Sequence, residues 1–213
     1  IPNGILINEI APYINEIQGG GGLPEEPSLP EVAEYEDILA IENVDEVEGT
    51  VFMNNPNSIP IQYSTNGTEF NEYTTASEVP IGVGEKVYFK WSGGIGKYVL
   101  FGAKNIVNSS VKYKTYGELK QGNISNAYYY MFQNNSNLID ASGLKLTATT
   151  LAESCYRKKK KKCTSLVEVP QLTATTIASS CYSNMFRDCT SLTTAPQLST
   201  PTLAEGCYSS MFY

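Results

Sequence analysis

Residues 181–206, CYSNMFRDCTSLTTAPQLSTPTLAEG, decide the fold of this chain because the same 26-residue pattern recurs on both sides of them. The pattern also starts at Cys155, as CYRKKKKKCTSLVEVPQLTATTIASS, and again at Cys207, while a copy two residues longer starts at Ala127. A fixed period of this size is typical of a solenoid, in which each unit buries its apolar face against its neighbours. We therefore predict a leucine-rich-repeat-type solenoid over residues 121–213, cut off within a unit.

The apolar residues of one unit predict a short helix followed by a short strand. Three apolar pairs recur every four residues and would line one helical face: Leu203-Ala204, Cys207-Tyr208 and Met211-Phe212. TLAE at residues 150–153 and 202–205 matches the capping box that opens many helices. The extended segment after each helix predicts a ligand face, formed by Glu168, Gln171, Thr193, Thr194 and Gln197.

Residues 33–120 carry a β pattern that predicts a small, Ig-like β-sandwich. Its clearest signal is IQYSTNGTEFNEY at residues 61–73, where two alternating runs flank Asn66-Gly67. That dipeptide is typical of a two-residue type I′ hairpin turn, which needs positive φ at both positions. The aromatic residues of these strands favour core packing, with a carbohydrate-stacking platform as the alternative: Tyr63, Phe70, Tyr88 and Trp91. The fold class predicted for the whole chain is thus mixed α+β.

Residues 1–18 predict an N-terminal docking arm. INEI occurs twice, seven residues apart, which places four isoleucines at a and d positions of two heptads: Ile7, Ile10, Ile14 and Ile17. Isoleucine at both positions favours three-stranded packing, hence a homotrimer, whereas Pro12 favours an extended peptide that orders on a partner. Residues 19–32 are rich in Gly, Pro and Glu and predict a flexible acidic linker.

Composition excludes several functions. The chain has no histidine, which removes Ser-His-Asp and Cys-His catalysis and His-based zinc sites, so we predict no enzyme and assign no catalytic, cofactor-binding or metal-ligating residues. The net charge is −7, and residues 1–85 contain no lysine or arginine, which argues against a nucleic-acid partner. No apolar run is long enough to predict a membrane span.

The five cysteines fall into two columns of the repeat, Cys155, Cys181 and Cys207 in one and Cys163 and Cys189 in the other. We favour buried free thiols, because Asn135 occupies the second column in the first copy. The alternative is one disulfide within each unit, Cys155–Cys163 and Cys181–Cys189.

Five consecutive lysines at residues 158–162 break the repeat. Alignment places Lys159 and Lys160 on Met185 and Phe186, in the predicted buried face, where two unpaired ammonium groups would cost several kcal/mol each. The alternatives are a locally distorted unit, a basic functional patch, or residues wrongly assigned at these positions. We favour the third, because every flanking residue keeps the repeat.

Units of the form LTATTLAxxCYxxMFxxCTSLxxAPxL resemble the BspA-like leucine-rich repeat family of bacterial surface proteins. Related repeats occur in phages of gut Bacteroidales, often behind a β domain with a hairpin similar to YSTNGTEF at residues 63–70. The resemblance covers about residues 50–213. It implies a non-catalytic recognition or adhesion module that is exposed on a virion or a cell.

We therefore expect a virion structural and recognition protein, a phage head or tail fibre that displays the repeats for adhesion to a host-surface glycan or protein. In this hypothesis residues 1–18 dock on other virion proteins. A bacterial cell-surface adhesin, with the arm docking on cell-surface proteins, is the alternative, and a carbohydrate-processing enzyme is the more distant one.

Overall fold

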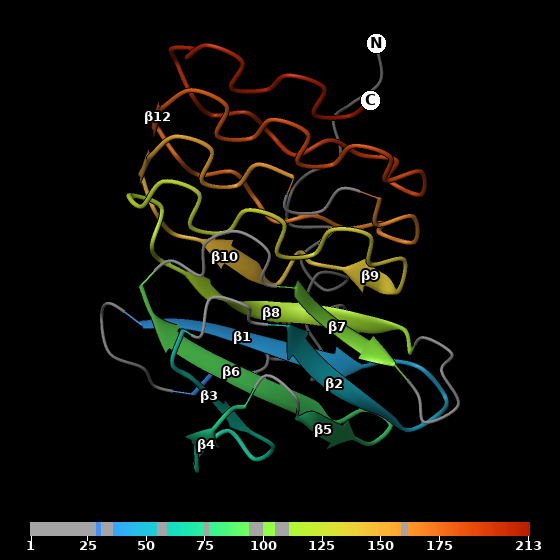
Figure 1. Cartoon of the computed structure of the whole chain (residues 1–213). Helices are drawn as coiled ribbons and strands as arrows, with labels where there is room; N and C mark the ends of the chain where they lie inside the picture. The colour runs from blue at the N-terminus through green and yellow to red at the C-terminus, as the bar shows by residue number, and fades with distance from the viewer. Residues whose placement is uncertain are drawn as a thin grey trace, which may run out of the picture.

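The computed structural model describes residues 29–30, 36–54, 59–74, 77–93, 100–104, 111–158 and 162–213, of which 100–104 are described by their backbone alone. The docking arm predicted at residues 1–18 and most of the linker at 19–32 lie outside these residues. The described chain forms a seven-stranded and a three-stranded β-sheet, and the repeats, which contain a further two-stranded sheet, are stacked in layers beyond them (Figure 1).

Sheet A has seven strands in the hydrogen-bonded order β10-β8-β1-β6-β3-β4, with β9 also paired to β8. Its strands are β1 (Glu36–Asn43), β3 (Ile61–Ser64), β4 (Asn71–Glu72), β6 (Lys86–Ser92), β8 (Tyr113–Leu119), β9 (Leu138–Asp140) and β10 (Leu144–Leu146). The β1 strand lies between β6 and β8 and is antiparallel to both. Because β9 and β10 pair with β8, sheet A crosses the predicted domain boundary at residue 120 and joins the repeats to the β region.

Sheet B has three strands in the order β5-β2-β7, namely β5 (Glu78–Ile81), β2 (Gly49–Asn54) and β7 (Leu100–Lys104). One apolar core joins the two sheets and the repeats, and it includes Leu39 and Phe89 of sheet A, Val51 of sheet B, and Tyr156 and Phe186 of the repeats. Trp91, 2% exposed, belongs to the same core and offers no platform for a sugar.

The hairpin predicted around Asn66 is present, because β3 and β4 pair antiparallel, but its turn is not type I′. Only Gly67 has a positive φ, of 78°. The Asn66 side chain organises the loop instead, since its Oδ1 accepts hydrogen bonds from the amides of Thr68 and Glu69, each at 3.0 Å. The result is a six-residue connection between the two strands rather than a two-residue turn.

The prediction of a mixed α+β fold with a solenoid of helix/strand units is wrong. The described residues contain strands and turns but no helix, so this part of the chain is all-β. The physical reason is a left-handed residue at every fourth position of the repeat, as at Ser180 (φ 57°), Asn184 (φ 56°) and Asp188 (φ 60°). A right-handed helix does not tolerate such residues, so the backbone closes one tight turn and then starts another.

Successive repeats lie on one another through backbone hydrogen bonds between equivalent positions. Alternate amides donate to the next unit, as from Ser180 to Glu205 O (3.0 Å) and from Tyr182 to Cys207 O (2.9 Å). The amides between them donate to the carbonyl three residues earlier, as from Ser183 to Ser180 O (3.2 Å). The short strand predicted after each helix is reduced, in residues 193–198, to a single bridge between Leu172 and Leu198. The strands β11 (Thr150–Leu151) and β12 (Thr176–Ile177) pair in parallel where a helix start was predicted.

Candidate functional site

The five residues of the predicted ligand face are all exposed. Glu168 and Thr194 are one period apart, as are Gln171 and Gln197, so the side chains recur on adjacent layers. Asp140, which bridges to Glu168 in parallel, extends this set to the edge of sheet A. We call the set formed by Glu168, Gln171, Thr193, Thr194 and Gln197 the polar face.

The polar face continues onto the outer side of sheet A. Lys145 of β10 is exposed one period before Gln171 and lies in register with Glu118 of β8. Lys114 of β8 forms an ion pair with Asp140, with 3.5 Å between Nζ and Oδ2. Amide and hydroxyl groups can donate hydrogen bonds to sugar hydroxyls or peptide groups, and amide, hydroxyl and carboxylate oxygens can accept them. The arrangement suits non-covalent recognition.

The five cysteines are free and buried, and the thiols of Cys163 and Cys181 bond to the backbone. Cys163 Sγ lies 3.0 Å from Phe132 O, and Cys181 Sγ lies 2.8 Å from Ala178 O. Burial raises the pKa of the Cys181 thiol to about 11, so this thiol stays protonated at neutral pH. These contacts give the cysteines a structural role at the turns, and the structure does not contain the alternative disulfides.

Sequence reasoning missed a column of stacked tyrosines inside the repeats. The rings of Tyr128, Tyr156, Tyr182 and Tyr208 follow one another at centroid distances of 5.3, 5.8 and 5.5 Å, and their planes differ by 12° or less. The signal was present, because three of these tyrosines are one period apart. The column begins at Asp37, a fully buried carboxylate of β1 that accepts a hydrogen bond from Tyr128 OH at 2.8 Å.

The lysine run keeps the repeat backbone at both of its ends. Lys158 and Lys162 have left-handed φ values of 54° and 61°, and their amides donate to Ser183 O and Arg187 O of the next unit. The Lys158 ammonium lies 5.3 Å from the centre of the Tyr130 ring. Lys159 and Lys160, on which the hypothesis of a wrong assignment depends, lie outside the described residues.

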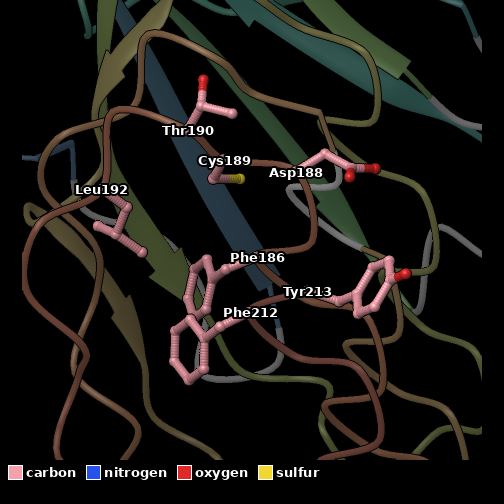
Figure 2. Close-up of a pocket in the computed structure, with 7 residues that line it drawn as sticks. All are labelled: Phe186, Asp188, Cys189, Thr190, Leu192, Phe212 and Tyr213. Carbon is pink, nitrogen blue, oxygen red and sulfur yellow. The ribbon is translucent and has the colours of Figure 1, made fainter.

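A cavity of about 170 Å³ opens at the last layer of the repeats. Figure 2 shows the rings of Phe186 and Phe212 side by side in it, 5.7 Å apart between centroids. The other lining residues are Asp188, Cys189, Thr190, Leu192 and Tyr213. Phe212 is 48% exposed and Tyr213 is 78% exposed.

A second cavity, of about 290 Å³, lies at the β4 end of sheet A. Its lining combines both charge signs with amide and hydroxyl groups, from Glu36, Gln62, Glu72, Lys90 and Ser92, over Pro60, Ile61 and Trp91. The Lys90 ammonium is held 4.4 Å from the centre of the Phe70 ring. The lining offers hydrogen-bonding groups for a small polar molecule.

Among the described residues, no group of three His, Cys, Asp or Glu side chains is placed to hold a metal ion. The same part of the chain contains no helix of sufficient length and apolarity to span a membrane.

Comparison of the chain with family models, curated proteins and solved structures found no match. The resemblance to BspA-like repeats therefore stays an interpretation of the sequence.

Proposed function

We propose that this protein is a non-enzymatic recognition protein of a virion, a phage head or tail fibre that uses its repeats to adhere to a glycan or protein on the host surface. The observation that carries the proposal is the polar face, where exposed side chains with hydrogen-bonding groups recur on successive layers and continue onto sheet A. Identical spacing on successive layers suits a ligand that itself repeats, as a surface polysaccharide does.

Two features support attachment at one end and display at the other. The isoleucine arm at residues 1–18 and its linker precede the β region, whereas the polar face belongs to residues 168–197. In this proposal the arm docks on other virion proteins, and the protein is at the virion surface.

A double substitution tests the polar face. Gln171→Ala with Gln197→Ala removes two amides that are one period apart and exposed, so the expected result is at least about tenfold weaker binding to host cells or to their isolated surface glycan. The matched control is Thr150→Ala with Thr176→Ala, which removes two exposed hydroxyl groups, also one period apart, from β11 and β12. Equal binding by both double variants would contradict the proposal.

The bacterial cell-surface adhesin remains the second candidate, because the units resemble those of such proteins. Antibodies against the repeats distinguish the two: labelling of purified virions supports the fibre, and labelling of uninfected cells supports the adhesin. Turnover of the bound glycan by the purified chain would instead support a carbohydrate-processing enzyme.

A further inference from the structure

The cavity at the β4 end of sheet A is built by the register of three neighbouring strands. Gln62 of β3 lies directly opposite Glu72 of β4 on one side and Lys90 of β6 on the other. Directly opposite residues of a sheet point to the same face, with Cβ atoms about 4.5–5.5 Å apart. The three side chains therefore stand in one row, and Ser92, two positions after Lys90 on β6, points to the same side. The strands β3 and β4 lie at the end of the molecule away from the repeats (Figure 1).

The polar groups around this cavity are not used by the protein itself. Within the described part of the chain, no side-chain hydrogen bond or ion pair is made by Gln62, Glu72, Lys90 or Ser92. The Lys90 ammonium lies over the Phe70 ring, 4.4 Å from its centre, although carboxylates line the same cavity. Lys114 of the same sheet, by contrast, forms an ion pair with Asp140 at 3.5 Å. The cavity thus keeps a cation and a carboxylate apart, with space between them.

We infer that this cavity is a binding site for a small zwitterion, a molecule that carries both an ammonium and a carboxylate group. The Lys90 ammonium donates to the carboxylate of the ligand, and the Glu72 carboxylate accepts from its ammonium. The Gln62 amide stands between the two and can donate to or accept from a hydroxyl group of the ligand. The cavity volume of about 290 Å³ is at the lower end of the range of about 300–1,000 Å³ for small-molecule sites, which suits one amino acid or one sugar residue.

The opposite signs of the two free charges select this class of ligand. Hydrogen bonds to charged groups are stronger than those between neutral groups. An anion would pair with Lys90 but bring its charge close to Glu72, and a cation would do the reverse. Glu36, the other carboxylate of the lining, already has an interaction within the chain, so one charge of each sign is left for a ligand. A zwitterion pairs with both.

Four sugars on one scaffold, together with L-serine, test the inference by isothermal titration calorimetry of the full chain at slightly acidic pH. Glucose carries neither charge, glucosamine carries the ammonium, glucuronic acid carries the carboxylate, and 2-amino-2-deoxyglucuronic acid carries both. We expect a zwitterion to bind at least about tenfold more tightly than each of the other three sugars, because it pairs both charges. Tighter binding of the aminated uronic acid than of L-serine identifies a glycan residue as the ligand, and the reverse identifies a free amino acid.

Two variants assign the charges, and a third is the matched control. Lys90→Met keeps an apolar stem over the Phe70 ring but removes the ammonium, so the aminated uronic acid should bind no more tightly than glucosamine. Glu72→Gln should reduce its affinity to that of glucuronic acid. Lys86→Met makes the same change on β6 outside the cavity, beside the Tyr116 ring, and should leave every affinity unchanged. The inference is overturned if neither zwitterion exceeds the other sugars tenfold, or if Lys86→Met weakens binding as much as Lys90→Met. None of these outcomes bears on the polar face, so the two proposals fail separately.

Discussion

The same substitution at two positions of the tyrosine column should have different effects on stability. Tyr128 OH donates to the buried Asp37 carboxylate, with distances of 2.8 and 2.9 Å to its two oxygens, and accepts from the amide of Gln121 at 2.6 Å. Tyr182 OH is also buried, but it has no hydrogen-bond partner among the described residues. Burial raises the pKa of both hydroxyls, so both remain neutral at physiological pH.

The magnitudes follow from these contacts. Tyr128→Phe removes one hydrogen bond to a charged group, worth about 1.5–3 kcal/mol, and one neutral bond worth about 0.5–1.5 kcal/mol. We expect it to lower the free energy of unfolding by about 2–4.5 kcal/mol. Tyr182→Phe removes a hydroxyl that was desolvated without compensation, so its effect should lie between zero and a stabilisation of about 1 kcal/mol.

Urea denaturation followed by the fluorescence of Trp91, which is the single tryptophan and is buried, measures both variants. Tyr182→Ala serves as the packing control and should cost about 3–5 kcal/mol, because it removes a ring stacked on both faces. Equal losses for Tyr128→Phe and Tyr182→Phe would refute the reasoning, because the hydrogen-bonded hydroxyl of Tyr128 would then contribute no more stability than the unbonded hydroxyl of Tyr182.

Four further predictions concern thiols, packing and backbone. Denatured, unreduced protein should take up five iodoacetamide groups, because all five cysteines are free; a single group would indicate the two alternative disulfides. Burial raises the pKa of the Cys181 thiol to about 11 in the folded state, so the stability that this thiol contributes should be fully present below about pH 9 and be lost as the pH rises through about 11. The urea midpoint of Cys181→Ala should therefore fall less over this range than that of the unsubstituted protein. Equal pH dependence of the two midpoints would contradict the assignment. Gly117→Ala should cost more than about 2 kcal/mol, because a Cβ there would meet Ile38 O at 2.2 Å and φ is 148°; Gly84→Ala, with open space around it, should cost only about 1 kcal/mol. Lys159→Met with Lys160→Phe restores the pattern of the next unit and should raise the urea midpoint of unfolding, because burial of each apolar side chain is worth about 1.5–3 kcal/mol. Peptide mass analysis across residues 155–163 first checks that the lysines are correctly assigned.

The β region could be predicted in part from the sequence. Alternation around Asn66-Gly67 predicted the hairpin, and the regular exposure of Glu168, Gln171 and their equivalents followed from the period. The β1 strand was missed because Ile38 to Ile41 are buried in succession, which leaves no alternation to detect. Such a run is typical of a central strand that is covered on both faces.

The helix prediction failed on the difference between a period of 4 and a period of 3.6. Apolar pairs at an unvarying four-residue spacing drift off one helical face by about 40° per turn, so the pattern fits better to a chain that turns once every four residues. The residues between the pairs carried the same information. Asn, Asp, Gly and Ser recur at the fourth positions, as in Ser180, Asn184 and Asp188, and Asn, Asp and Gly are the residues that adopt left-handed backbone most readily.

Once the units are known to stack with a constant period, the tyrosine column follows from the sequence, because a residue that recurs at that period packs against the equivalent residue of the next unit. The residue that anchors the column does not follow. Asp37 lies 91 residues from Tyr128, on a strand without a periodic signal, and nothing local to either residue predicts their contact. A buried carboxylate has to find donors, so the cost of burying Asp37 without Tyr128 ties the register of the repeats to sheet A. The repeat therefore determines its own internal order, and its attachment to the rest of the molecule depends on a contact that only the folded chain creates.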